Sequence, residues 1–263
     1  MYEIKVFDLN GNEKAAASGV REAVLAWSGD YVEGDEIRFT LPEENQYYMI
    51  KVDDVLEESF IYSTVSELVY KIPFAEKKDS MNQKAFTGER HYLTVRTARE
   101  DEVKAYKNLA RNASAQHEFA GYYPFASANV ETRGESVFAA KNAIDGVVAN
   151  LSHGKWPYAS WGINMQDDAE FKLEFGRPVD IDRIVLYTRA DFPHDNWWTE
   201  VTFTFSDGTQ ETVSLEKRIE GHELAIQRKN ITWLTFGNLI KADDPSPFPA
   251  LTQMEVYGWE SEK

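Results

Sequence analysis

The sequence has no cysteine among its 263 residues, which excludes disulfides, thiolate nucleophiles and zinc sites with cysteine ligands. It is also poor in basic residues, with 28 Lys and Arg against 44 Asp and Glu and a formal net charge of -16 at pH 7. Proteins bind nucleic acids largely by neutralising phosphates with Lys and Arg. The charge balance therefore argues against a nucleic-acid partner.

Long apolar runs are absent as well, because no segment approaches the roughly 20 apolar residues of a membrane-spanning helix. The first residues, Met1–Asp8, alternate like a strand and lack the charged and then apolar regions of a signal peptide. We therefore expect no membrane span and a cytoplasmic protein, although a secreted protein trimmed of its signal would give the same pattern. The sequence also lacks a Gly-x-Ser-x-Gly motif, a phosphate-binding loop and a dinucleotide fingerprint.

What is present is a globular composition, 43% hydrophobic and 13% aromatic, with many short segments in which apolar and polar residues alternate. This period of two predicts β-strands. In the first part of the chain we predict strands at residues 2–7, 36–41, 47–52, 58–62, 68–72 and 91–97, and a short helix near Val20–Trp27. In the second part we predict strands at residues 171–175, 184–189, 201–205, 211–215, 224–227, 232–239 and 253–257.

Between these two groups of strands lies a segment rich in Ala, Glu, Lys and Arg. Val103, Tyr106 and Leu109 follow one another at three-residue intervals in it, which fits one apolar face of a helix. We therefore predict an all-β protein of two β-sandwich, jelly-roll-like domains at residues 1–98 and 117–260, joined by a helical linker at 99–116. The sequence does not indicate what the first domain does.

Four motifs of the second domain resemble the galactose-binding-like superfamily, that is, discoidin or coagulation-factor C-type domains and related bacterial carbohydrate-binding modules. They are the turn Asn142-Ala143-Ile144-Asp145-Gly146, the Trp of Ser160-Trp161-Gly162, a strand running into an Arg189-containing loop, and the ending Glu255-Val256-Tyr257-Gly258. The resemblance covers about residues 127–259. It implies a β-sandwich with a sugar site on loops at one end.

The resemblance also implies a structural calcium beneath the Asp-Gly turn, since oxygen ligands of this kind suit that ion. Matched by position, the ligands would be Asn142, Asp145, Val147, Asn150, Met254 and Glu255, with Asn142, Val147 and Met254 binding through backbone carbonyls. The alternative is that Asp145 only caps the turn.

For the sugar site, the resemblance points to His153 and Trp156 in one loop and to Arg189, Asp191 and Asn196 in another. The same loops contain His194, Asp195, Trp197 and Trp198, and a Pro-rich loop adds Phe248. Indole rings in loops can stack on sugars, and Arg and His can bind hydroxyls. One member of the Trp197–Trp198 pair is expected to point inward, Trp161 is expected in the core, and Trp233 is expected in the core or on the surface of the sheet.

Two alternatives remain open for these residues. The His153 and His194 imidazoles, with Asp191 or Asp195, could instead bind zinc, although their spacing is not typical of a metal site. Arg189 could form a salt bridge with Asp191 or Asp195 in place of a ligand contact.

Paired acidic residues also occur in the first domain, at Asp53-Asp54 and Glu57-Glu58. Adjacent residues of a strand point to opposite faces, so we interpret these pairs as solvated edges and not as an acid and base. The function that these patterns favour is non-catalytic binding of a mono- or oligosaccharide. The alternatives are a glycan-active enzyme with a site at the domain interface and a protein-interaction scaffold.

Overall fold

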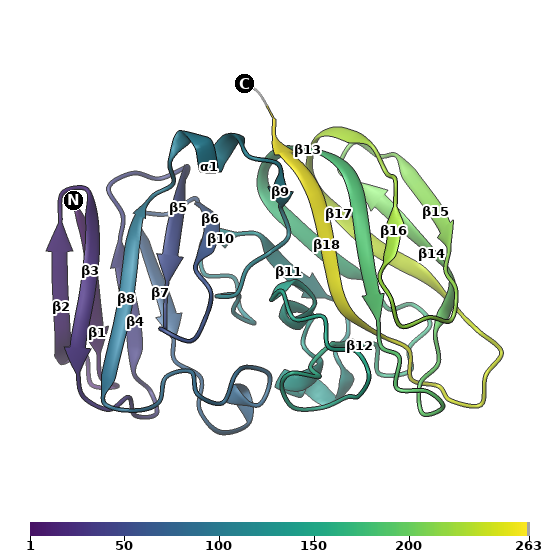
Figure 1. The fold of residues 1–263 in the computed structure, drawn as a ribbon, viewed down its shortest axis with the longest axis horizontal. Coiled ribbons are helices and arrows are strands. Elements are labelled where there is room, and N and C mark those ends of the chain that lie inside the picture. The colour runs from purple at the N-terminus through teal and green to yellow at the C-terminus, as the bar shows by residue number, and fades with distance from the viewer. Residues whose placement is uncertain (262–263) are drawn as a thin grey trace.

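The alternating segments of the sequence form two β-sandwiches that lie side by side in the computed structural model, which describes residues 1–261 (Figure 1). The N-terminal sandwich packs a four-stranded sheet, in the order β2-β1-β4-β7, against a five-stranded sheet, in the order β10-β6-β5-β8-β3. Alternate residues such as Ile4 and Val6 point into the core between the sheets, as strand geometry requires. The strands are β1 (Tyr2–Phe7), β2 (Glu13–Gly19), β3 (Glu22–Ser28), β4 (Glu36–Thr40), β5 (Gln46–Lys51), β6 (Ser59–Ser63), β7 (Glu67–Lys71), β8 (Arg90–Thr97) and β10 (Tyr122–Tyr123).

The helix predicted near Val20–Trp27 is wrong, because this segment forms β3. Ala23 and Leu25 are buried while Val24 and Ala26 are exposed, which is the period of a strand. β3 pairs with β8 along its whole length. The helix-forming tendency of its Ala and Leu residues is therefore outweighed by sheet pairing and by burial of one face.

The connection between the domains is only partly helical. α1 spans Glu100–Lys104, shorter than the predicted helix, and Ala105 is already extended. β9 (Lys107–Asn108) then pairs with the last strand, and Leu109 and Ala110 join the core of the C-terminal domain. The chain afterwards returns to the N-terminal domain, where β10 pairs with β6. The two domains are thus connected by segments that cross between them more than once.

The C-terminal sandwich is organised around one long strand, β13 (Phe171–Thr188), which lies between β18 and β17 in a nine-stranded sheet. Its first part pairs with β11 and β17, and its last part pairs with β18 and β16. Between them Gly176 has a φ of 70°, and a Cβ at this position would collide with the ring of Tyr123. The other strands are β11 (Phe125–Ala128), β12 (Trp161–Gly162), β14 (Trp198–Phe205), β15 (Gln210–Ser214), β16 (His222–Leu224), β17 (Arg228–Lys241) and β18 (Ala250–Glu260).

Two tryptophans form the centre of this second core. Trp161 and Trp198 are both fully buried, and each packs against Phe236. Trp161 is thus in the core as predicted, and Trp198 is the inward-pointing member of the Trp197–Trp198 pair. The predicted ligand role of Trp198 is therefore wrong, because its ring has no access to solvent.

A buried ionic cluster connects the two domains. Nε and Nη2 of Arg177 donate hydrogen bonds to the Glu260 carboxylate at 2.9 and 2.8 Å. The side chains of Arg177 and Glu260 are 3% and 6% exposed. Tyr47 of the N-terminal domain donates a hydrogen bond to the same carboxylate at 3.0 Å. The Lys107 ammonium lies 3.7 Å from it, and burial lowers the pKa of that lysine.

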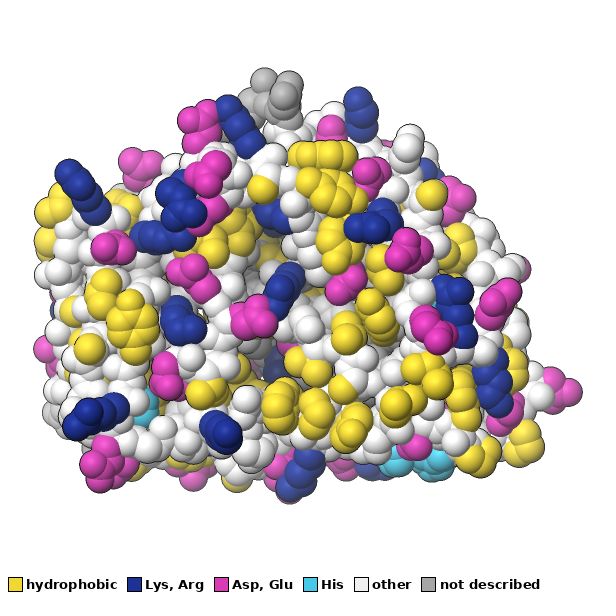
Figure 2. All heavy atoms as spheres, viewed as in Figure 1, with side chains coloured by type: hydrophobic (Ala, Val, Ile, Leu, Met, Phe, Trp, Pro, Cys, Tyr) yellow, Lys and Arg dark blue, Asp and Glu magenta, His cyan; other side chains and the backbone are white. Residues whose placement is uncertain are grey.

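On the surface, charged side chains of both signs are interspersed, and the face shown in Figure 2 has no large patch of one sign. Among residues 1–261, no helix has the length and apolar character needed to cross a membrane.

The ionic cluster leads to a prediction about stability. Glu260→Ala leaves Arg177 buried without its partner, which typically costs about 3–5 kcal/mol. We expect urea unfolding of the full chain to show a loss of this size. Glu118→Ala, which removes an exposed ion pair with Lys71, is the matched control and should change stability far less. Equal effects of the two substitutions would contradict a structural role for the cluster.

Candidate functional site

A pocket of about 480 Å³ lies at the end of the C-terminal sandwich, where β13 ends. It collects residues from the segment before β12, the loop that contains His153, the turn after β12, the loop after β13 and the chain leading into β18. The lining residues are Thr132, Arg133, Phe138, His153, Gly162, Ile163, Asn164, Met165, Arg189, His194, Phe248, Pro249 and Ala250. Segments far apart in the sequence therefore converge on one concave surface.

Arg189, the first residue after β13, is held from two sides. Its Nε donates to Asp195 Oδ1, in an ion pair whose side chains are 5% and 0% exposed. Its Nη2 donates to the carbonyl of Phe248 at 2.7 Å. These bonds fix the guanidinium plane and leave Nη1 for a ligand. The salt bridge considered as an alternative to ligand binding thus exists, with Asp195, and orients the arginine at the pocket.

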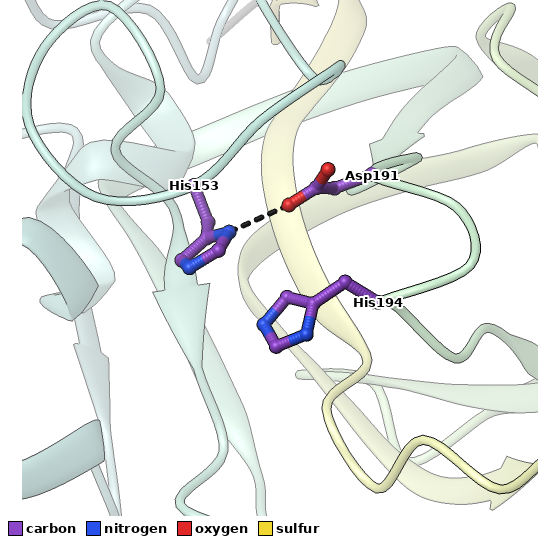
Figure 3. A group of neighbouring side chains, drawn as sticks. All are labelled: His153, Asp191 and His194. Carbon is purple, nitrogen blue, oxygen red and sulfur yellow. Dashed lines mark hydrogen bonds and ion pairs between the residues drawn. The ribbon is translucent and has the colours of Figure 1, made fainter.

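His153, Asp191 and His194 point toward one another at the rim of the pocket (Figure 3). His153 Nδ1 lies 2.6 Å from Asp191 Oδ2, and the two imidazole rings are 4.6 Å apart between centroids. A carboxylate can only accept a hydrogen bond, so Nδ1 of His153 carries a hydrogen. In the neutral ring, Nε2 is then an acceptor available to a ligand hydroxyl.

One side of the pocket is apolar. Phe248 is 41% exposed and lies 5.5 Å from the His194 ring, while Phe138, Ile163 and Met165 add further apolar surface. Phe248 was predicted from its Pro-rich loop, whereas the other three were missed. Asn164 and Met165 both have positive φ, and no sequence pattern signals that two residues without a glycine turn the chain here.

The remaining predicted ligand residues do not line the pocket. Trp156 donates its backbone N–H to the carbonyl of Asp79 in the N-terminal domain, at 2.8 Å. The Asn196 amide donates to the Ala242 carbonyl at 3.1 Å, and the Lys217 ammonium lies 4.9 Å from the Trp197 ring. Asp195 is fully buried beneath Arg189. The side chains of Asn196, Trp197 and Asp195 are thus engaged within the protein, and Trp156 is held through its backbone.

Several of the predicted calcium ligands make hydrogen bonds within the protein. Asp145 Oδ1 accepts the N–H of Val147 at 2.8 Å, and both amide hydrogens of Asn150 bind carbonyls, those of Thr188 and Ile219. Glu255 accepts a hydrogen bond from Tyr257 at 3.2 Å.

A neutral amide and two cations lie near the turn. The side chain that reaches it from β18 is the amide of Gln253, which accepts the Gly146 N–H at 3.3 Å. Lys141 and Arg111 are the cations that act on the Asp145 carboxylate. Asn142 binds carbonyls with its amide and accepts from Lys141, while Met254 pairs with Leu186 in the sheet. These contacts are unfavourable for the predicted calcium ion, and Asp145 caps its own turn.

A second cavity, a groove of about 770 Å³, separates the two domains. In this groove, Nε2 of His117 lies 2.7 Å from Oε2 of Glu131. Burial acts to raise the pKa of Glu131, but hydrogen bonds from His117 and Ala140 bring it below its ordinary value. Burial lowers the pKa of Lys141, whose ammonium donates to Ser80 of the N-terminal domain at 3.0 Å.

Comparison with known proteins gives matches for the C-terminal domain. A domain family of unknown function, DUF7402, matches residues 123–242, less than half of the chain. No curated protein matches the sequence.

Three solved structures illustrate the structural likeness. A chitosan-binding module of a chitosanase/glucanase from Paenibacillus sp. IK-5 is 18% identical, with a TM-score of 0.39 over 57% of this chain and 98% of the module. The lectin domain of lectinolysin, complexed with Lewis B antigen, is 18% identical, with a TM-score of 0.42 over 59% and 98%. A fucose-binding module of Streptococcus pneumoniae is 11% identical, with a TM-score of 0.41 over 58% and 98%.

The C-terminal domain is thus similar to carbohydrate-binding modules of known structure, as the motifs of the sequence predict. Identities below 20% and TM-scores below 0.5 say nothing about the ligand of this chain. The ligand has to be inferred from the pocket itself.

The Asp145 turn gives a prediction with a defined pH dependence. Burial raises the pKa of Asp145 to about 7, against an ordinary value of 3.8. Between about pH 4 and 7 the folded state therefore holds a proton that the unfolded state releases. The free energy of unfolding increases as pH falls through this range. Asp145→Asn keeps the hydrogen bond to Val147 but removes this charge. We expect the variant to be more stable than the wild type at pH 8, with the difference shrinking toward pH 5.

Thermal melts of both proteins at pH 8, in calcium and in chelator, provide the control. We expect the wild-type midpoint to be the same in both solutions. A wild-type midpoint several degrees higher in calcium, together with a less stable Asp145→Asn variant, would restore the calcium site predicted from the sequence.

Proposed function

We propose that the pocket at the end of the C-terminal sandwich binds a carbohydrate without turning it over. The observation that carries this proposal is that a fixed guanidinium, two imidazoles and an exposed aromatic ring line one cavity. A sugar presents hydroxyl groups at its edge and C–H groups on its face. A pocket for it needs oriented polar groups on one side and an aromatic or apolar surface on the other.

The polar groups are held in position before any ligand arrives. Arg189 is fixed by Asp195 and the Phe248 carbonyl, and His153 is fixed by Asp191. Arg189 Nη1 is a donor, and His153 Nε2 can exchange a hydrogen bond with a hydroxyl, so together they can bind neighbouring hydroxyls of one sugar. The volume of about 480 Å³ lies in the range of small-ligand sites and suits one or two sugar rings.

The pocket offers no pair of acidic groups for hydrolysis. Most glycosidases hold two carboxyl groups roughly 5–10 Å apart across the scissile bond. None of the described residues that line this pocket is Asp or Glu. Asp191 is bound to His153, and Asp195 is buried beneath Arg189. These observations favour binding over catalysis.

We expect full-length protein to bind at least one mono- or oligosaccharide of a glycan panel, measured by calorimetry on the best binder. His194→Ala and Phe248→Ala should each weaken that binding by about 1–3 kcal/mol, because each removes a polar or stacking contact. His117→Ala, in the groove between the domains, is the matched control and should bind like the wild type.

Two outcomes would overturn the proposal. Release of reducing sugar by the wild type, abolished by Glu131→Gln, would locate an enzyme at the domain interface. Absence of any glycan binding, in protein whose melting is normal, would favour a protein-interaction scaffold.

A further inference from the structure

A second constellation of chemically active side chains lies in the N-terminal domain, away from the proposed sugar pocket. Asp53 and Asp54 follow β5, and His91 lies on the neighbouring strand β8. A ring nitrogen of His91 and one carboxylate oxygen from each aspartate all lie within 4.8 Å of one another. Asp53 and His91 are 2% and 4% exposed, whereas Asp54 is exposed. The interpretation of Asp53-Asp54 as a solvated edge is therefore wrong for Asp53.

The hydrogen bonds of His91 determine which of its nitrogens is free. Its Nε2 lies 2.8 Å from the carbonyl oxygen of Gly29, which can only accept, so Nε2 carries a hydrogen. In the neutral ring Nδ1 then has a lone pair, and this nitrogen is buried without a hydrogen-bond partner among the described residues. The ring cannot turn easily, because Trp27 and Tyr31 pack against it at centroid distances of 4.8 and 4.3 Å.

Asp53 is likewise held in place. Its Oδ1 accepts the N–H of Val55 at 3.0 Å and its Oδ2 accepts the N–H of Phe86 at 2.8 Å. Each carboxylate oxygen keeps a further lone pair for another partner. A buried carboxylate within 4.8 Å of an imidazole that has a buried, unpartnered nitrogen is unfavourable unless something positive lies between the two groups. Such buried, unpaired groups in native proteins often mark an ion or a water.

We propose that His91 Nδ1, Asp53 and Asp54 form a binding site for a divalent first-row metal ion such as zinc. Bonds of about 2.0–2.2 Å to nitrogen and oxygen place neighbouring ligand atoms more than 3 Å apart, so a shared ion accounts for atoms that are close but do not hydrogen-bond. The imidazole favours such a metal over calcium or magnesium, which prefer oxygen ligands alone. The Gly29 carbonyl and the backbone N–H groups on Asp53 supply the outer contacts that usually orient metal ligands.

Other charged groups surround this site. Lys78 faces Asp53, and burial lowers the pKa of this lysine. The charge of Asp35 acts to raise the pKa of the Tyr31 hydroxyl, whose ring packs against His91. Asp35 Oδ1 is buried and has no hydrogen-bond partner among residues 1–261. The second oxygen of Asp35 binds Lys14 at 2.5 Å. Lys14 and Asp35 pair with each other, so the two carboxylates of the site stand against the single ammonium of Lys78, and the remaining negative charge favours a cation.

The cluster of His153, Asp191 and His194 differs from the Asp53, Asp54 and His91 cluster because its histidine and carboxylate bind each other directly. There His153 Nδ1 and the Asp191 carboxylate make a direct hydrogen bond of 2.6 Å, and both histidines are exposed. Those groups are satisfied without an ion. They could nevertheless take up zinc from solution, so a test has to separate the two clusters.

The test is a calorimetric titration of metal-stripped, full-length protein with zinc, carried out in a His153→Ala/His194→Ala background that removes the pocket cluster. We expect one zinc ion per chain in this background. Adding Asp54→Asn should weaken binding at least about tenfold, since the loss of even an outer contact has effects of that size. Asp54 is exposed, so this variant should fold normally, and its thermal melt without metal provides the check.

A second measurement reports the position of the ion. Copper or nickel at this site should quench the fluorescence of Trp27, whose ring lies 4.8 Å from that of His91. Trp27→Phe should remove the quenched component and retain metal binding. No zinc binding in the His153→Ala/His194→Ala background, or unchanged affinity after Asp54→Asn, would overturn the proposal.

Discussion

A buried ion pair between Arg189 and Asp195 determines the shape of the candidate sugar site. Asp195 binds the guanidinium with one oxygen and the backbone N–H of Asp191 with the other, at 2.9 Å for the latter. The Asp191 carbonyl in turn accepts the N–H of His194 at 2.8 Å. Because Arg189 also binds the Phe248 carbonyl, this ion pair connects the end of β13, the loop that contains Asp191 and His194, and the chain that leads into β18. Burying such a pair costs desolvation, so we interpret it as a device that fixes geometry more than one that adds stability.

The position of that pair follows from the path of β13. The first part of this strand pairs with β11 and β17, and its last part pairs with β18 and β16. Arg189 directly follows β13, so the strand places it at the end of the sandwich where the loops of the pocket lie. Near the bend in β13, Arg177 binds Glu260 of the last strand and, through it, contacts Tyr47 of the N-terminal domain. The strand that carries the site is thus anchored to both domains.

The sequence predicts most of the strands, because one buried face gives a period of two that can be read directly. The all-β class and the two sandwiches are confirmed. The helix near Val20–Trp27 is wrong because pairing with β8, which is distant in the sequence, decides its conformation. The linker helix is short because β9 and Leu109 gain more from joining the second domain than from extending α1. Such long-range contacts leave little signal in a single sequence.

The site was predictable in its residue types and less so in its geometry. The loop histidines, Arg189 and Phe248 could be singled out because they stand in turns where exposed aromatic and polar groups need a reason. Asn196 and Asp195 stand in the same loop, but their polar groups turn inward to hold the backbone. The apolar wall of Ile163 and Met165 depends on a turn with positive φ that contains no glycine. Whether a polar side chain faces a ligand or its own loop depends on such local backbone geometry.

The most direct test of the account is a crystal structure of the full chain with the sugar that it binds best. We predict electron density for that sugar between the Phe248 ring and the polar groups of Arg189 and His153, with Asp195 still bound to Arg189. Sugar density in the groove between the domains, or on the surface of the sandwich with this pocket unchanged, would contradict it.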